Sequence, residues 1–139
     1  MEKHNLINHQ FIVKELSFVR KDKKDGNFTL KPKFGKRIVK IDDTTYEVGL
    51  RVDFIDTPEE PFPFNLTVVT ALLVSFPDNT FSDETLKEFL NVNCIQILFP
   101  YLRTLVTNMT SSAMVKPIVL PIVDVREFEE ERDHEEVAK

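Results

Sequence analysis

The side chains that usually carry chemistry are few in this sequence and stand far apart. The three histidines, His4, His9 and His134, lie near the two ends of the chain, and none has a cysteine or carboxylate at metal-ligand spacing. The single cysteine, Cys94, sits in an apolar stretch without a flanking motif, which favours a core thiol over a nucleophile. We therefore expect no metal site.

Motifs for phosphate binding and for nucleophilic catalysis are also missing. Three glycines in 139 residues leave no glycine-rich loop, and Ser111-Ser112 lacks the G-x-S-x-G frame of a nucleophile elbow. The acidic pairs Asp42-Asp43 and Glu59-Glu60 fall in predicted turns, where carboxylates are solvated. The sequence predicts a protein that is not an enzyme, with no catalytic residues and no cofactor.

The composition is that of a soluble globular protein, with 42% apolar and 29% charged residues. We expect one domain over residues 1–139, ending in an acidic segment over residues 124–139. No window supplies the roughly 20 apolar residues of a membrane helix, the N-terminus lacks the apolar core of a signal peptide, and one cysteine cannot form an internal disulfide. These features predict a cytoplasmic protein without membrane insertion.

Charge is spread unevenly along the chain. Residues 124–139 hold eight acids and three bases, whereas residues 1–123 hold 15 of each sign. Within the balanced part, residues 20–40 contain nine bases and two acids. A basic stretch can mark nucleic-acid binding, but this one has no RNA-binding aromatic motif and the tail cancels its field. We interpret it as a solvated connection and a lysine-protected edge strand, and expect no nucleic-acid partner.

Alternation of apolar and polar residues predicts four strands, over residues 10–20, 34–41, 46–54 and 62–76. The third is the clearest, because Tyr46, Val48, Leu50, Val52 and Phe54 share one face while polar residues share the other. The fourth is apolar on both faces toward its end, which indicates cover on both sides. Short links between the strands favour an antiparallel meander.

A long helix follows, with Ser82 as a plausible N-cap, a restart near Asn93, Pro100 in its interior and an end near Ser112. Its apolar stripe consists of Cys94, Leu98, Tyr101, Leu102, Leu105 and Met109. The opposite face is polar but almost uncharged, and it comprises Arg103, Thr104, Thr107, Asn108 and Ser111 together with Gln96. A solvent-facing helix normally shows Lys and Glu there, so we expect another subunit to cover this face.

Pro117 and Pro121 then enforce an extended passage, and residues 123–138 suggest a short terminal helix anchored by Phe128. The predicted fold is α+β: a four-stranded antiparallel sheet with a long helix packed on one face and a short C-terminal helix. Twelve phenylalanines are present, and Phe28, Phe34, Phe62 and Phe128 lie in or near irregular segments. These rings either present a groove for extended polypeptide or close the ends of the core.

Residues 93–103, Asn-Cys-Ile-Gln-Ile-Leu-Phe-Pro-Tyr-Leu-Arg, resemble the helix signature of the SecB export-chaperone family. Three further pieces agree in the family's order: residues 14–18, residues 46–52, and residues 117–123 with their Leu-Pro step. The similarity covers about residues 10–128. It implies a homo-tetramer, a dimer of dimers with the long helices at its centre.

The resemblance also implies an ATP-independent holdase that binds unfolded or unassembled polypeptide in apolar grooves. Such grooves lie between the crossover connection of the first two strands and the final helix. The matching residues here are Phe28, Leu30, Phe34, Ile38, Val39, Ile41, Val125 and Phe128.

Export members of the family dock on the SecA motor through acidic residues of the sheet. Glu15 keeps one of these charges, whereas Val19 and Thr67 stand at two other acidic positions. Two functions therefore remain open: a general holdase for protein export, or a dedicated interaction protein for one client, such as an antitoxin, without delivery to a motor.

Overall fold

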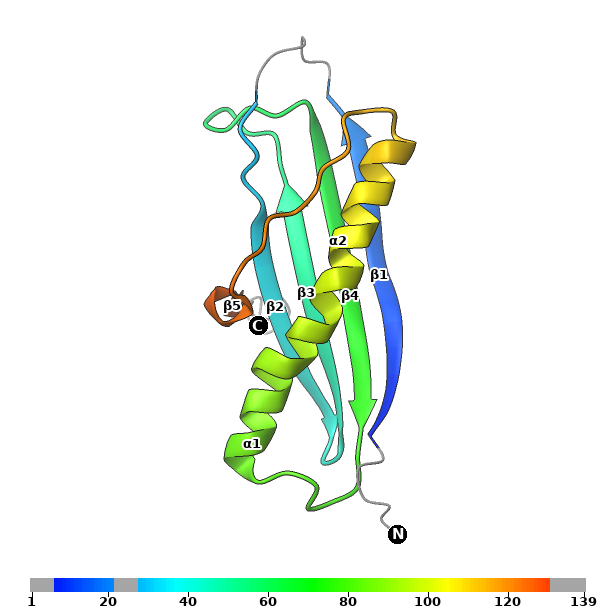
Figure 1. The fold of residues 1–139 in the computed structure, drawn as a ribbon, viewed down its shortest axis with the longest axis vertical. Coiled ribbons are helices and arrows are strands. Elements are labelled where there is room, and N and C mark those ends of the chain that lie inside the picture. Colours follow the sequence, from blue (N-terminus) through cyan, green and yellow to red (C-terminus); the bar gives the residue numbers. More distant parts are fainter. Residues whose placement is uncertain (1–6, 22–27, 131–139) are drawn as a thin grey trace, which may run out of the picture.

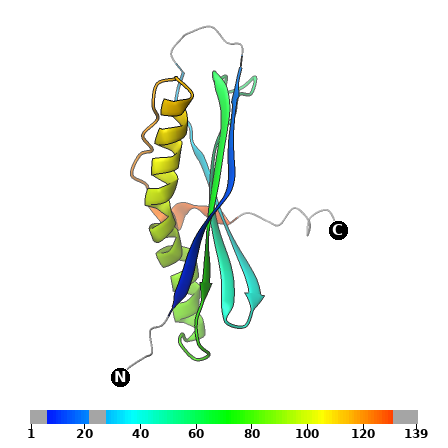
Figure 2. The ribbon, with the colours of Figure 1, turned by 90° about the vertical axis from the view of Figure 1, so that its right-hand side faces the viewer.

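The computed structural model describes residues 7–21 and 28–130, which form two layers, a sheet and a helical rod (Figures 1 and 2). The strands are β1 (Asn8–Arg20), β2 (Lys33–Asp42), β3 (Thr45–Phe54), β4 (Phe64–Ser75) and β5 (Glu129–Glu130). The rod consists of α1 (Asp83–Glu88), the π-helical turn η1 (Phe89–Asn93) and α2 (Cys94–Ser112).

The strand order is β1-β4-β3-β2-β5, which corrects the predicted meander in part. The strands β2, β3 and β4 do form an antiparallel meander, since short links join them. However, β1 pairs with β4 rather than with its sequence neighbour β2. The connection over residues 21–32 is long enough to cross the end of the sheet, so the pairing of β1 is decided by packing and not by proximity along the chain.

The sheet turns one apolar face toward the rod. The predicted alternation of apolar and polar residues in β3 is confirmed, because Val48, Leu50 and Val52 are fully buried. Each of them lies opposite a helix-facing residue of β4, as in the pair Val52 and Val68. Burying each such side chain contributes about 1.5–3 kcal/mol. The face of the sheet away from the rod carries no helix in the described part of the chain (Figure 2).

The two predicted helical pieces are one rod. Ser82 caps it as expected, because its Oγ accepts a hydrogen bond from the Thr85 N–H at 3.2 Å. The restart expected near Asn93 corresponds to the single π-helical turn η1, after which α2 continues without a break. Pro100 lies inside α2, and the Thr104 hydroxyl donates to the Pro100 carbonyl at 3.0 Å.

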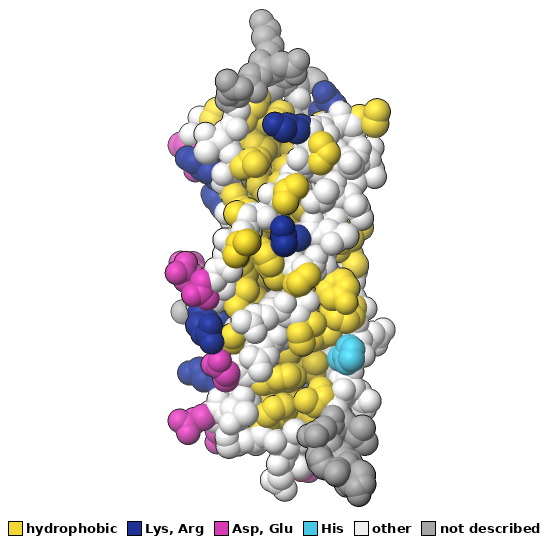
Figure 3. Space-filling model, viewed as in Figure 1, with side chains coloured by type: hydrophobic (Ala, Val, Ile, Leu, Met, Phe, Trp, Pro, Cys, Tyr) yellow, Lys and Arg dark blue, Asp and Glu magenta, His cyan; other side chains and the backbone are white. Residues whose placement is uncertain are grey.

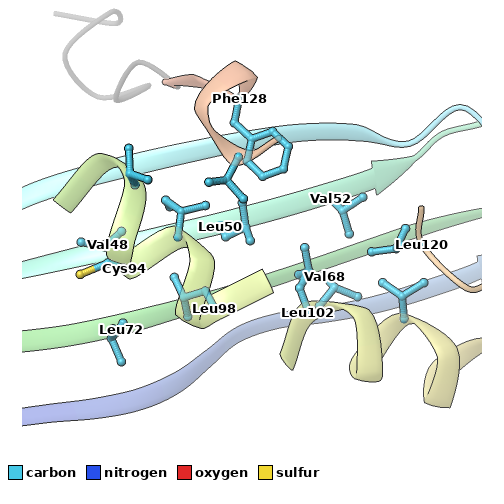
Figure 4. Packing of buried hydrophobic residues seen from close by; sticks show 14 of the residues in the cluster. Val48, Leu50, Val52, Val68, Leu72, Cys94, Leu98, Leu102, Leu120 and Phe128 are labelled. Atoms are coloured by element: carbon cyan, nitrogen blue, oxygen red, sulfur yellow. The ribbon is translucent and has the colours of Figure 1, made fainter. Parts of the chain in front are cut away.

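The buried stripe of α2 is Cys94, Ile95, Leu98, Leu102 and Val106, all fully enclosed over β3 and β4 (Figure 4). Tyr101, placed by sequence in this stripe, is 52% exposed, which corrects that assignment. Its ring centroid lies 4.4 Å from that of Phe11 on β1. The reason is the position of α2, which crosses the centre of the sheet and leaves β1 largely uncovered.

The continuous helix Asp83–Ser112 is long and apolar enough to span a membrane, by length and composition only. The packing of this helix against the sheet explains why it is so apolar. The residues that make it apolar include Leu98 and Leu102, which have no exposed surface because β3 and β4 cover them. It is the core helix of this fold.

The predicted terminal helix over residues 123–138 is wrong for the described part of the chain, and its remainder lies outside the described residues. After α2 the chain is extended, then forms a 3-10 turn, η2 (Val125–Glu127), and β5. β5 runs parallel to β2, which makes the sheet five-stranded and mixed instead of four-stranded and antiparallel. Like charges three or four residues apart, such as those of Glu127 and Glu130, disfavour a local helix, whereas the extended segment lets Phe128 stack on Phe34.

Candidate polypeptide-binding surface

An aromatic cleft of about 300 Å³ opens at one end of the sheet, between the crossover connection and the β3–β4 loop. Its walls are Phe28, Thr29, Lys31, Lys33, Phe54, Ile55, Glu59, Glu60, Pro61 and Phe62. The rings of Phe28 and Phe62 meet edge to face with centroids 6.1 Å apart. Leu30, next to the cleft in sequence, is 51% exposed. Apolar surface is therefore offered here beside charged groups.

Hydrogen bonds and ion pairs hold the β3–β4 loop, whose Phe62 is buried in the core cluster. The Asp56 N–H donates to Asn65 Oδ1 at 2.7 Å, and Asp56 Oδ1 accepts from the Phe62 N–H at 2.9 Å. The Glu60 carboxylate ties this loop to the crossover through Lys31 at 3.3 Å and Lys33 at 3.5 Å. The hydrogen bond and charge of Lys31 lower the pKa of Glu60.

A second group of rings lies between β2, α2 and the C-terminal segment. Phe34 stacks on Phe128 with centroids 4.7 Å apart, and Phe99 lies 5.9 Å from Phe34 and 6.2 Å from Phe128. Phe128 and the nearby Val125 are buried in the core cluster. Phe128 of the same chain therefore covers the rings of Phe34 and Phe99.

The eight residues predicted to bind clients do not form one surface. Phe28 lines the cleft, the exposed Leu30 lies outside its lining, and Phe34 and Ile38 face the rod from β2. Val39 is in register with Glu47 on the other face, and Ile41 is 53% exposed near the end of the strand. As binding residues these all remain predictions.

The cleft residues Phe54, Ile55, Glu59 and Glu60 were not anticipated as part of a site. The Pro58-to-Pro61 loop between two strands was visible in the sequence, and two adjacent acids opposite a basic connection are a weak signal of contact. That the loop and the crossover meet follows only from β1 and β2 lying at opposite sides of the sheet.

The outward face of α2 holds the predicted subunit interface. Thr104, Asn108 and Ser111 are exposed, and Arg103 is half-buried with its Nε enclosed and without a hydrogen-bond partner among the described residues. Thr107 differs, because its hydroxyl donates to the Ile118 carbonyl of its own chain at 2.7 Å. The interface itself remains a prediction.

Apolar residues that no described part of the chain covers lie beside this face. Phe11, Val13 and Leu16 on β1 are 40–51% exposed, and Ile97 and Tyr101 on α2 are 43% and 52% exposed. The side of β1 away from β4 has no strand partner within the described ranges. Figure 3 shows apolar side chains along the middle of this view, while acidic and basic groups are interspersed along its left border.

On the open face of the sheet the carboxylates are paired with neighbours. Lys14 contacts Glu47 at 2.8 Å, and Arg51 contacts Asp53 at 2.8 Å. Thr67, buried, donates its hydroxyl to Asp53. Glu15 is exposed and accepts from the Ser17 hydroxyl at 2.7 Å. Docking of a motor through Glu15 stays a prediction, on a face with mixed charge.

The described part of the molecule contains few side chains suited to nucleophilic attack or metal binding. Burial raises the pKa of the Cys94 thiol to about 12, so the thiolate needed for nucleophilic attack is scarce at neutral pH. His9 is exposed and packs edge-on to Phe11, whereas His4 and His134 lie outside the described residues. No group of three His, Cys, Asp or Glu residues is placed to hold a metal ion within residues 7–21 and 28–130.

These features define a two-layer α+β protein. Its most distinctive surface features are an aromatic cleft and exposed apolar residues. The sequence matches the family of preprotein translocase subunit SecB over residues 2–135, and the chain belongs to that family. Membership places it among chaperones of the protein-transport class.

Individual relatives agree with this assignment. The chain is 31% identical over 123 residues to the protein-export protein SecB of Orientia tsutsugamushi strain Boryong, covering 84% of this chain and 76% of that protein. The SecB of strain Ikeda is equally similar, with 74% of its length covered. A solved SecB-like chaperone of Mycobacterium tuberculosis, in complex with a ChAD peptide from an antitoxin, shares the fold with a TM-score of 0.68 at 14% identity, covering 84% of this chain and 90% of that chain.

Proposed function

We propose that this protein is an ATP-independent holdase of the cytoplasm, which binds unfolded or unassembled polypeptide and keeps it competent for export. The observation that carries this proposal is the aromatic cleft, which is lined by Phe28, the buried Phe62, and lysine and glutamate side chains, with the exposed Leu30 close to it in sequence. Such a surface accepts apolar side chains of an extended chain while keeping the protein itself soluble.

The proposed mechanism is physical and needs no bond chemistry. A client residue fully buried against these rings contributes about 1.5–3 kcal/mol. A homo-tetramer, a dimer of dimers, offers several such surfaces to one client, and linked weak contacts strengthen one another through effective concentration. A client held in this way cannot collapse on its own apolar residues.

An aggregation assay with several unrelated, chemically unfolded client proteins tests the proposal. We expect near-stoichiometric amounts of the protein to suppress light scattering from each of them. Leu30→Asp places a charge beside the cleft and should weaken suppression about fivefold, which corresponds to about 1 kcal/mol. Ile122→Asp changes a residue that is 92% exposed and does not line the cleft, so it is the matched control. Failure to protect any client would overturn the proposal.

A second candidate is a dedicated chaperone for one client, such as an antitoxin. Two observations favour it: the antitoxin peptide bound by the structural neighbour, and the loss of acidic side chains at Val19 and Thr67. Protection of a single partner in the same assay would select this function.

Binding to SecA, measured by titration, separates the two candidates further. A general export role predicts binding that Glu15→Gln weakens, while a dedicated role predicts none.

A further inference from the structure

Lys36 is a charged side chain that lies almost fully buried between the sheet and the rod, and the proposed function does not use it. It is 8% exposed, and its register partner on β3 is Leu50, which has no exposed surface. Its Nζ donates a hydrogen bond to the Asn91 carbonyl at 3.3 Å. A buried ammonium needs acceptors inside the protein, because taking a charge out of water is costly. The acceptor here belongs to the π-helical turn η1 of the rod.

The turn η1 differs from the rest of the rod in its backbone bonding. The Cys94 N–H donates to the Phe89 carbonyl, five residues earlier, and α-helical bonding continues through α2. A single π-helical turn of this kind adds one residue to an α-helix. The added residue changes the direction in which the side chains before the turn point, relative to those after it.

Without the added residue, the two ends of the rod would present different faces to the sheet. Counted back from Leu98 at about 100° per residue, an uninterrupted α-helix turns Leu86 about 120° and Leu90 about 80° away from the direction of Leu98. Lys87 would lie within about 20° of that direction instead. The added residue brings both leucines within about 20° of Leu98. Burial agrees with this count, because Leu90 is 5% exposed, Leu86 packs against the core cluster and Lys87 is exposed.

We propose that Lys36 holds the rod in this register. Its ammonium stabilises the π-helical turn, and the turn keeps the leucines on both sides of it facing the sheet. The i→i−4 bonding of an α-helix is interrupted at a π-helical turn, so a carbonyl of the turn needs another donor. Lys36 supplies that donor from β2. The inference concerns the rod and goes beyond the proposed function, because it requires no client.

Deletion of Asn91 tests the role of the turn. It removes one residue from η1, so that a continuous α-helix can present Leu86 and Leu90 to the sheet in their present direction. We expect this variant to fold and to melt in one cooperative transition, followed by circular dichroism.

Deletion of Gln96 is the matched control, since this residue of α2 is exposed. It rotates Cys94 and Ile95, which have no exposed surface, by about 100° relative to Leu98. We expect the cooperative transition to be lost. If deletion of Asn91 is as damaging as deletion of Gln96, the proposed role of the turn is overturned.

The effect of Lys36→Met should change sign between the full chain and the chain without Asn91. In the full chain it should lower the melting temperature by about 5 °C, because the turn loses a charged donor. In the chain without Asn91 it should raise the melting temperature, because it removes a buried ammonium whose acceptor is gone. All variants are compared at one protein concentration. A loss of the same size in both chains would overturn the inference.

Amide hydrogen exchange supplies a local measurement that does not depend on the deletions. In Lys36→Met the Cys94 N–H, which closes the turn onto the Phe89 carbonyl, should exchange about tenfold faster, and by a larger factor than amides after Leu102. Lys40→Met, on the same strand with a side chain that is 57% exposed, is the control and should leave the Cys94 rate unchanged. Equal Cys94 rates in the two lysine variants would overturn the assignment to Lys36.

Discussion

At the residue scale, two threonines of α2 fix the chain that follows the helix. The Thr107 hydroxyl donates to the Ile118 carbonyl at 2.7 Å, and the Ile118 N–H donates to Thr110 Oγ1 at 2.9 Å. Thr110 has no exposed surface, and its hydroxyl donates to the Val106 carbonyl at 2.8 Å. Both backbone groups of Ile118 are thus satisfied where the passage crosses the helix, which a buried strand-like segment requires.

Met114 occupies a position that suits glycine. It has a φ of 64° just after α2, where the Met114 and Val115 N–H groups bond back to Ser111 and Thr110. Its side chain is 87% exposed, so little packing is lost on removal. Met114→Gly should raise the free energy of unfolding by about 1 kcal/mol and the melting temperature by about 3 °C.

The matched control for this change is Ser112→Gly, which falls at the last helical residue and should lower the free energy of unfolding by about 0.5 kcal/mol. Thermal and urea unfolding measure both variants. Destabilisation by Met114→Gly would show that the left-handed conformation carries no strain.

Glu60 should make the crossover sensitive to acid. Lys31 lowers the pKa of Glu60 below its ordinary value of 4.5, so the ion pair stabilises the native loop above about pH 4.5 and is lost as the pH falls through the lower folded-state pKa. Glu60→Gln removes the effect, and the difference in urea midpoint between wild type and variant should shrink as the pH falls below the lowered folded-state pKa of Glu60. Glu59→Gln, outside both lysine pairs, should show no such convergence.

At the element scale, the rod has one face on its own sheet and one face without cover in the described chain. The inward face is apolar except for the buried Thr110, whereas the outward face combines Thr104, Asn108 and Ser111 with the exposed Tyr101. A helix with this outward composition is typical of contact with another protein surface. The free edge of β1 and its exposed apolar residues extend the same area.

Asn108→Glu should split the proposed tetramer while leaving the fold intact, because the side chain is exposed and a buried unpaired charge costs several kcal/mol. Light-scattering mass measurement should show smaller assemblies, with unchanged circular dichroism. Thr107 is a poorer probe, since its substitution also breaks the bond to Ile118. Lys116→Glu is a charge-changing control outside α2. A wild-type protein that is already monomeric would contradict the interface.

At the scale of the whole molecule, folding and assembly should be coupled. One chain leaves residues such as Val13 and Leu16 about half exposed on the rod side of β1, and association would remove them from water. The melting temperature of the wild type should therefore rise with protein concentration, as mass action requires for an assembly that dissociates on unfolding. Asn108→Glu should flatten this dependence, and a wild-type melting temperature independent of concentration would argue against coupled assembly.

Local patterns explain why part of the architecture was predictable. The alternation of β3 and the periodic stripe of α2 indicate which side chains are buried. That information does not depend on which other element covers them. The cap at Ser82 is likewise local, since Ser82 and Thr85 are three residues apart. The family signature over residues 93–103 adds that the rod is the centre of a known fold.

Other features were not predictable because they depend on partners distant in sequence. The sequence predicted a helix over residues 123–138. In the structure, Phe128 instead packs against Phe34 and Phe99, which are distant in sequence. Val125 and Phe128 are buried in this arrangement, and their role in client binding stays a prediction.

The sequence alone determined the two layers, most of the buried stripe of the rod and the family, because burial periodicity and a specific motif are properties of contiguous residues. Tertiary structure alone decided the pairing of β1 with β4, the meeting of the crossover with the β3–β4 loop, and the docking of Glu129–Glu130 on β2. These three contacts join segments that are distant in sequence. Which segments meet depends on how the whole chain packs around one core, and local sequence patterns do not contain that information.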